Sequence, residues 1–244
     1  MYTNLKLIGV MKIEIWSDIM CPFCYIGKRR LEKALESFEY RDQIVIEWKS
    51  FLLNPGMKTD PSKNSLAYLS EVKGWSMEQT KQITEQVVAM AAAEGLDYDM
   101  ENTVVANAYQ AHRLLHFAKS HGFGSPMKER LLRAYFTEGL NIDDTETLIN
   151  LASEVGLEKV EVKACLDSDA FLKEVNEDVQ EAQQLGVRGV PFFVLDRKYG
   201  ISGAQQDEVF QQTIAKAFAG YQASMGISFL DSDGQACDVE GHNC

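Results

Sequence analysis

The sequence predicts an α/β fold with a large inserted α-helical domain. A strand, a helix and a second strand open the chain, helical patterns alone fill its middle, and short strands return near residue 190. Because strands separated in this way can still join one sheet, we assign residues 11–60 and 187–220 to one discontinuous domain. Residues 61–186 are then a helical insertion domain, and residues 221–244 are a C-terminal tail.

The opening unit is predicted from the spacing of apolar side chains. Residues 12–17 and 44–53 are rich in β-branched and aromatic side chains, which is typical of strands. Between these segments, apolar residues recur at intervals of three and four, the spacing of one helix face. The residues of this face are Ile26, Leu31, Ala34, Leu35 and Phe38.

Helical periodicity then continues for more than a hundred residues. Glycines follow several of the predicted segments, as is common at the C-terminal ends of helices, and Asp144 or Thr145 is a candidate N-cap. We predict helices over residues 76–94, 104–120, 126–137, 145–155 and 170–185, strands over 191–195 and 200–202, and a last helix over 206–218.

The composition limits the partners of the protein. Its 36 acidic and 24 basic residues give a net charge of −12, which opposes binding to nucleic acid or to anionic membranes. No apolar run approaches the roughly 18 residues that cross a bilayer. The segment before Met11 lacks a small-residue cleavage site, so we expect no signal peptide and a cytoplasmic protein that starts at Met1 or Met11. The oligomeric state is not predicted.

A Cys-x-x-Cys motif, Cys21-Pro22-Phe23-Cys24, stands between the first strand and the first helix. Proline is tolerated at the first helical position, which places Cys21 at the N-cap. Unpaired N–H groups and the helix dipole are expected to lower the pKa of Cys21 and to favour the reactive thiolate. Cys24 lies one turn deeper, where it can attack a mixed disulfide on Cys21.

Zinc binding is the main alternative for this motif, because two cysteines at this spacing are also common in metal sites. Such a site needs two further ligands, and proline at a helix start suits redox chemistry better. His112 and His116 stand four residues apart but lack the glutamate of a metalloprotease motif. We therefore predict no metal site.

Pro191 begins the strand at 191–195, where proline removes a hydrogen-bond donor from the sheet. A cis peptide bond there would turn the backbone of Val190 toward Cys21 and leave it free to pair with an extended substrate. A trans proline at a sheet edge is the commoner arrangement, since only about 5–6% of such bonds are cis. Phe23, between the two cysteines, is a candidate substrate contact.

These segments together resemble the DsbA family of oxidoreductases, in particular its FrnE-like branch, over about residues 11–218. The matching segments are SDIMCPFCYIG at 17–27, FLLNP at 51–55, Asn107 with AHRL at 111–114, AYFTEG at 134–139, GVPFF at 189–193 and ISGAQ at 201–205. The resemblance implies a thioredoxin-like fold with a helical insertion, a redox-active pair at Cys21 and Cys24, and a cis Pro191. It also places Asn107 and His112 near the cleft, as substrate-binding candidates.

Kappa-class glutathione transferases and 2-hydroxychromene-2-carboxylate isomerases are related branches with a serine-type active site, from which this sequence departs. We therefore expect a protein disulfide oxidoreductase or isomerase acting on protein or small-molecule thiols and disulfides. A glutathione-dependent isomerase or transferase and a zinc- or peptide-binding module are the alternatives. No cofactor is predicted, although glutathione is a candidate reductant or co-substrate.

Three cysteines lie outside the motif. Cys165 follows apolar residues in a helical stretch and is expected to be a buried, unreactive side chain. Cys237 and Cys244 are candidates for a second redox pair, which FrnE-like proteins can carry. Thiols without function, or a zinc site that includes His242, are the alternatives for this pair.

Overall fold

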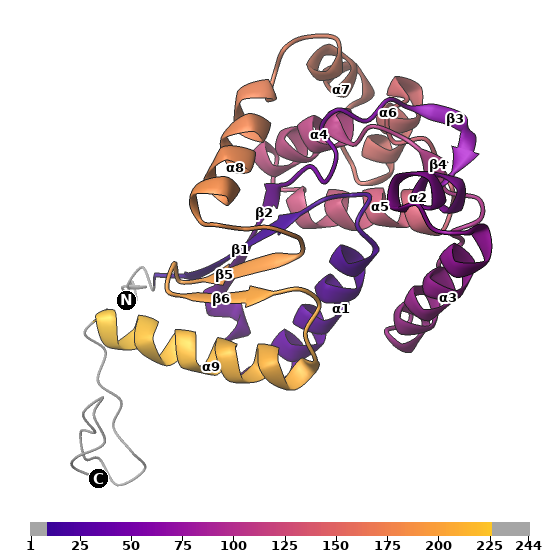
Figure 1. The fold of residues 1–244 in the computed structure, drawn as a ribbon. Coiled ribbons are helices and arrows are strands. Elements are labelled where there is room, and N and C mark those ends of the chain that lie inside the picture. The colour runs from indigo at the N-terminus through magenta and orange to yellow at the C-terminus, as the bar shows by residue number, and fades with distance from the viewer. Residues whose placement is uncertain (1–8, 226–244) are drawn as a thin grey trace, which may run out of the picture.

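A computed structural model describes residues 9–225 of the chain. A four-stranded mixed sheet forms its centre, in the order β2-β1-β5-β6 (Figure 1). Central strand β1 (Met11–Ser17) pairs in parallel with β2 (Ile44–Ser50), from Met11 opposite Ile44 to Ser17 opposite Ser50. It pairs antiparallel with β5 (Phe192–Leu195), which continues antiparallel to β6 (Tyr199–Ser202). The first and last parts of the chain therefore build one sheet, as predicted.

The alternation of side chains along β1 explains why helices cover both faces of the sheet. Ile13 and Ile15 belong to the main core with α1 (Pro22–Glu36) and α9 (Asp207–Ser224). Trp16 points to the other face, where it packs with Ala182 of α8 (Leu172–Gln184). Its indole nitrogen also donates to the carbonyl oxygen of Asp178 at 2.9 Å. The sheet is thus the middle layer, with α1 and α9 on one face and α8 on the other.

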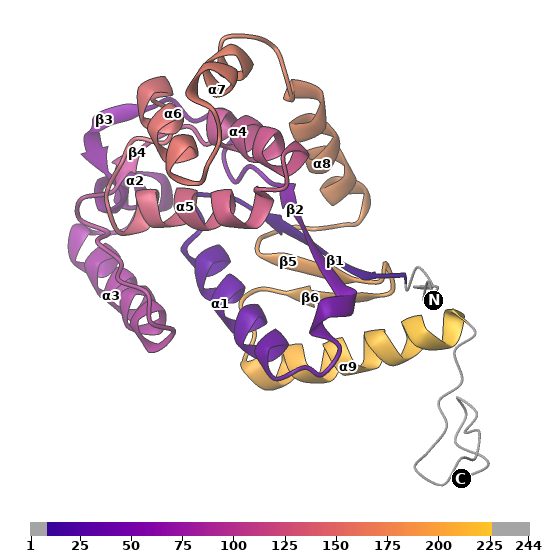
Figure 2. The ribbon, with the colours of Figure 1, turned by 180° about the vertical axis from the view of Figure 1, so that it is seen from behind.

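The segment between β2 and β5 contains the helical insertion. Its helices gather beyond the ends of β1 and β2, and α5 lies across the beginning of α1 in both views (Figure 2). The remaining elements are β3 (Asp60–Asn64), α2 (Ser65–Lys73), α3 (Met77–Ala93), β4 (Val104–Val105), α4 (Tyr109–Ser120), α5 (Gly124–Phe136), α6 (Thr145–Glu154) and α7 (Lys159–Leu166).

Two parts of the insertion differ from the prediction. Strand β3 and helix α2 were not predicted, and the helix expected from residue 104 begins only at Tyr109. Residues 104–105 instead pair with β3 as β4, in an irregular ladder from Asp60 opposite Val105. The side chain of Asn107 then accepts a hydrogen bond from the backbone N–H of Tyr109 at 2.8 Å. These contacts stop helical structure from extending backward into β4.

Side-chain caps fix several helix starts in the insertion. Ser76 and Gln79 form a reciprocal capping box at the start of α3. Asp144 accepts a hydrogen bond from the N–H of Thr147, which confirms the candidate cap of α6. Asn64 caps α2 in the same way through the N–H of Ala67. No helix of residues 9–225 is both long and apolar enough to be a membrane span.

Charged side chains tie α1 to the insertion. Arg30 is buried and pairs with Glu94, just after α3, at 2.6 Å, and it also donates to the carbonyl oxygen of Ala204 at 2.7 Å. Lys28 pairs with Glu129 of α5 at 2.6 Å. Because Arg30 and Lys28 are themselves buried, loss of a partner would leave an uncompensated charge. The beginning of α1 is therefore held against α3 and α5.

Gly27 on α1 packs closely against Pro191 and against Phe193 of β5. A Cβ atom at this position would lie 3.0 Å from Pro191 Cγ and 3.1 Å from the ring of Phe193. We expect Gly27→Val to lower the free energy of unfolding by about 1–3 kcal/mol through overpacking, measured by urea denaturation. Gly189→Val is the control, because nothing lies within 4 Å of its Cβ position. Equal stabilities of the two variants would contradict this close packing.

Candidate active site

Cys21 and Cys24 stand at the beginning of α1. The helix starts at Pro22, as predicted, with Cys21 at the N-cap in an extended conformation. Cys21 is 4% exposed and Cys24 is 1% exposed, whereas Phe23 between them is 38% exposed. Both are free thiols. Only a small part of Cys21 therefore reaches solvent, beside an exposed aromatic ring.

The loop before β5 brings a backbone carbonyl to Cys21. The Val190–Pro191 peptide bond is cis, as the resemblance implied. Cys21 Sγ donates to the carbonyl oxygen of Val190 at 3.3 Å. The carbonyl oxygen of Pro191 accepts from the N–H of Gly203 at 2.8 Å, which holds the loop to the end of β6. Residues 169 positions apart thus meet at one thiol.

The two thiols titrate as a coupled pair that shares one negative charge. Burial opposes ionisation of Cys24, but Cys21 and the positive charge of Lys128 lower its pKa overall. Once one sulfur is charged, that charge and burial oppose a second ionisation, and the pKa of Cys21 is raised well above the ordinary thiol value. The pair therefore carries a single charge shared by two sulfurs. The prediction that the helix end favours the thiolate of Cys21 stays a prediction.

Asp18 lies buried directly after β1. Its carboxylate accepts hydrogen bonds from the N–H groups of Met20 at 3.1 Å and Leu53 at 2.7 Å. His112 Nε2 lies 3.6 Å from Asp18 Oδ1. Burial alone would raise the pKa of Asp18, but His112 and the two amides lower it. The site therefore holds a carboxylate that stays charged although it is buried.

His112, on α4, faces Asp18, which lies three residues before Cys21. Its side chain is fully buried, and burial lowers its pKa. Neither ring nitrogen has a hydrogen-bond partner within the described part of the chain. The resemblance placed His112 near the cleft. In the structure His112 is buried and faces Asp18. No chemical role follows from this position alone.

Lys128 is a site residue that the sequence analysis missed. Its side chain is fully buried on α5, with Nζ 3.4 Å from the carbonyl oxygen of Ser17 and 5.5 Å from the ring centre of Trp48. Burial lowers the pKa of Lys128 to about 8. One signal was present in the sequence, because Lys128 begins an i, i+3, i+4, i+7 stripe that is otherwise apolar and buried. The stripe continues with Leu131, Leu132 and Tyr135.

Comparison with known proteins decides the family. The family model described as "DSBA-like thioredoxin domain" matches residues 12–215. The chain belongs to this family. This chain is 30% identical over 212 residues to the uncharacterized protein YwbO of Bacillus subtilis strain 168, a match that covers 83% of this chain and 95% of YwbO.

Solved structures agree with this assignment. The DsbA-like protein resembles the probable DsbA oxidoreductase SCO1869 from Streptomyces coelicolor, with a TM-score of 0.82, 40% identity and coverage of 93% of this chain and 99% of that one. The cytosolic disulfide reductase DsbM from Pseudomonas aeruginosa shares the fold, with a TM-score of 0.59, 16% identity and coverage of 88% and 98%. The predicted family and fold are therefore confirmed, and the family supports a thiol–disulfide oxidoreductase or a related isomerase.

The remaining candidate residues of the DsbA-like protein lie in different surroundings. Asn107 uses its side chain to hold the loop before α4, donating to the carbonyl oxygen of Met57 at 2.8 Å. Its role in substrate binding stays a prediction. Cys165 is buried as expected, and burial raises its pKa. Cys237 and Cys244 lie outside the described residues.

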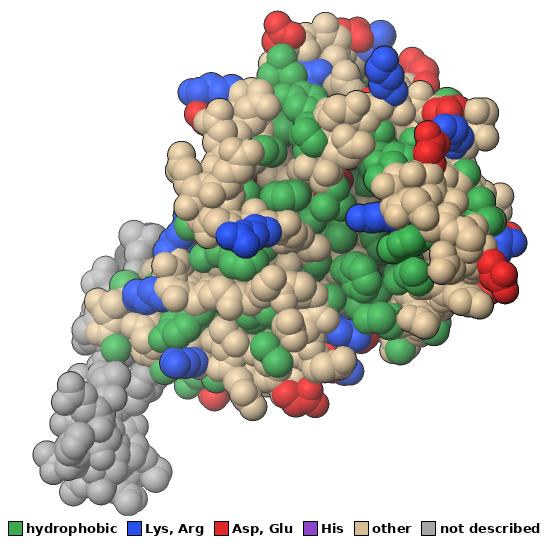
Figure 3. All heavy atoms as spheres, in the orientation of Figure 1, with side chains coloured by type: hydrophobic (Ala, Val, Ile, Leu, Met, Phe, Trp, Pro, Cys, Tyr) green, Lys and Arg blue, Asp and Glu red, His purple; other side chains and the backbone are tan. Residues whose placement is uncertain are grey.

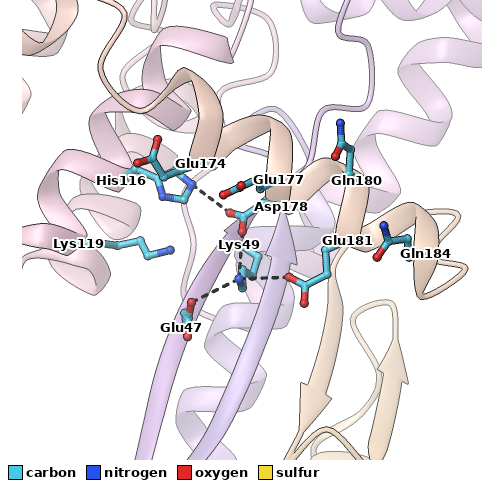
Figure 4. A pocket seen from close by; sticks show the side chains of 10 residues that line it. All are labelled: Glu47, Lys49, His116, Lys119, Glu174, Glu177, Asp178, Gln180, Glu181 and Gln184. Carbon is cyan, nitrogen blue, oxygen red and sulfur yellow. Dashed lines mark ion pairs between the residues drawn. The ribbon is translucent and has the colours of Figure 1, made fainter.

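A charged pocket lies between β2, α4 and α8 of the DsbA-like protein (Figure 4). Lys49 Nζ is 3.1 Å from Asp178 Oδ1 and 3.2 Å from Glu181 Oε2. His116 pairs with Asp178 at 3.0 Å. The central charges of this pocket thus pair with one another. Among the described residues, no group of three His, Cys, Asp or Glu side chains is arranged to hold a metal ion.

The surface of the DsbA-like protein around the thiols is largely apolar. Hydrophobic side chains gather in the hollow between the sheet domain and the helical insertion (Figure 3). Phe23 is 38% and Leu53 is 50% exposed, and the N–H of Leu53 binds the same Asp18 that lies three residues before Cys21. Met20 and Val190 are half-buried nearby. These side chains form an apolar rim that could contact a substrate.

We expect iodoacetamide at pH 7 to modify Cys21 at least about tenfold faster than Cys165 in the reduced protein, because the motif pair shares a thiolate and Cys165 does not. Exposure does not explain this order, since Cys165 is 6% and Cys21 is 4% exposed. The measurement is peptide mass mapping of a variant in which Cys237 and Cys244 are replaced by serine. Equal rates at Cys21 and Cys165 would contradict an ionised pair.

Proposed function

We propose that the protein catalyses thiol–disulfide exchange on protein substrates, with Cys21 as the nucleophile and Cys24 as the resolving thiol. One observation carries this proposal: Sγ of Cys21, the more exposed residue of the pair, lies 3.3 Å from the carbonyl oxygen of Val190. A reactive sulfur beside a backbone loop suits a peptide substrate, because the loop can align the chain that carries the disulfide.

The reaction proceeds in two exchanges. The reduced pair holds one thiol and one thiolate. Cys21, as the thiolate, attacks one substrate sulfur, and the other substrate sulfur leaves as a thiolate. Cys24 then gives its proton to the departed substrate thiolate and attacks Cys21 Sγ, which releases the first substrate sulfur as a thiolate that takes its proton from water. The Cys21–Cys24 disulfide remains, and the substrate gains two electrons and two protons as its disulfide becomes a dithiol. The reverse sequence oxidises a substrate dithiol.

The substrate backbone is proposed to pair with Val190, with Pro191 orienting that part of the loop. The N–H of Val190 has no hydrogen-bond partner in the described structure, so it is available to an extended peptide. The carbonyl oxygen of Val190 also becomes available once Cys21 no longer donates to it. Phe23 and Leu53 supply apolar contact beside this backbone edge. These features favour an apolar segment of a protein over a compact, highly charged substrate.

We propose glutathione as the reductant that regenerates the dithiol in a cytoplasmic protein, since cytosolic thiols are kept reduced by glutathione and thioredoxin. Two glutathione molecules would each give one electron and leave as glutathione disulfide. Glutathione is here a reactant and not a bound cofactor. A glutathione transferase or isomerase would instead use Cys21 alone and would not need the Cys24 thiol.

We expect Cys21→Ser and Cys24→Ser each to reduce the catalysed reduction of insulin to the uncatalysed rate, because each sulfur takes part in one exchange. Cys24→Ser should also accumulate a mixed disulfide between Cys21 and a substrate cysteine, detected by non-reducing electrophoresis and mass mapping. Cys165→Ser is the matched control and should keep full activity. Full activity in Cys24→Ser would contradict the dithiol mechanism and favour the glutathione-dependent alternative.

A further inference from the structure

A buried ammonium group at the end of β1 lacks a conventional partner. Lys128 is fully buried, and the contact of its Nζ with the carbonyl oxygen of Ser17 is long, at 3.4 Å. None of the ion pairs among residues 9–225 includes Lys128. Burial of an unpaired charge is costly, so a compensating negative charge is expected close by.

The charged groups that act on Lys128 come from two sides. The chain from the end of β1 into α1 presents Asp18, Cys21, Cys24 and Lys28, and α4 presents His112. Lys28 and a protonated His112 would repel the ammonium. Among the charged groups, only Asp18 and the thiol pair can offset its charge.

Asp18 is largely committed to other partners. Its two carboxylate oxygens receive the N–H groups of Met20 and Leu53, and Oδ1 also faces His112. The thiolate of the reduced pair is therefore the negative charge that remains to offset the ammonium of Lys128.

We propose that Lys128 is a positioning residue that stabilises the thiolate of the Cys21–Cys24 pair and so favours the reduced dithiol over the disulfide. This inference rests on the proposed function, since it assigns the electrostatic support of the thiol pair. Lys128 touches no substrate. It acts through the pair, from the helical insertion that covers the end of the sheet.

Oxidation removes the charge that Lys128 stabilises. The reduced pair, with one thiol and one thiolate, becomes a disulfide by losing two electrons and the one proton of the remaining thiol. The ammonium then keeps only Asp18 as an opposite charge. The oxidised form is therefore disfavoured by the buried charge, and Lys128 raises the reduction potential of the pair. Because the thiolate raises the pKa of Lys128, disulfide formation also makes loss of the Lys128 proton easier.

Lys128→Met tests this role, because methionine keeps an unbranched apolar stem and removes the charge. We expect the thiolate absorbance of the reduced protein at 240 nm to titrate about one pH unit or more higher than in the wild type. The equilibrium with a glutathione redox buffer should shift about tenfold toward the protein disulfide. Both readouts measure the thiol pair directly and need no protein substrate.

Lys119→Met is the matched control. Lys119 is also a largely enclosed lysine of the insertion, but its Nζ donates to the carbonyl oxygen of Trp48 at 2.7 Å and is not among the main charges that act on the thiols. It should leave the titration and the glutathione equilibrium unchanged. If Lys128→Met does not fold, Lys128→Gln gives a neutral polar replacement with the same two expected shifts.

The outcomes separate this inference from the proposed function. Unchanged titration and unchanged glutathione equilibrium in a folded Lys128 variant would overturn the role of Lys128, even if the wild type reduces insulin. Equal shifts in the Lys128 and Lys119 variants would overturn it as well, because a general loss of positive charge would explain both. A wild type that cannot reduce insulin would contradict the proposed function, while both Lys128 readouts could still be measured.

Discussion

The buried carboxylate of Asp18 joins the three chain segments that make the active site. It binds the N–H of Met20 before the motif and the N–H of Leu53 after β2, and it faces His112 of the insertion. The backbone carbonyl oxygen of Asp18 also accepts a hydrogen bond from the N–H of Cys21 at 3.3 Å. Because a buried carboxylate is stable only while its hydrogen bonds are made, these segments cannot separate without a large energetic cost. The position of Cys21 is therefore fixed relative to both parallel strands.

The sheet domain and the insertion contribute different things to this site. The sheet domain supplies both sulfurs and the Val190–Pro191 loop, which are the groups that react with or align a substrate. The insertion supplies contacts behind them: Tyr98 donates to the carbonyl oxygen of Pro22 at 2.7 Å, and Lys128 reaches the carbonyl oxygen of Ser17. The reactive groups are thus local to the thioredoxin-like half, whereas much of their electrostatic environment belongs to the insertion.

Local patterns explain how much of this arrangement could be predicted. The strand–helix–strand unit and the spacing of Cys21 and Cys24 are short-range features, so the sequence predicts them well. Strand β3 exists because Asp60 meets Val105 across 45 positions of chain, and a polar run such as DPSKN carries no strand pattern of its own. Lys128 was missed because a lysine on a helix is usually solvated, and only the packing of α5 on the end of β1 buries it.

The same limit applies to the ionisation of the pair. The rule for a cysteine at a helix N-terminus considers one sulfur and one helix, and it places the thiolate on Cys21. In the folded protein two further influences act: Cys21 Sγ donates to the carbonyl oxygen of Val190, and the buried ammonium of Lys128 acts on the pair from the insertion. The helix end and the insertion both favour a negative charge on the pair. The two sulfurs share that charge, so the pair ionises as one unit.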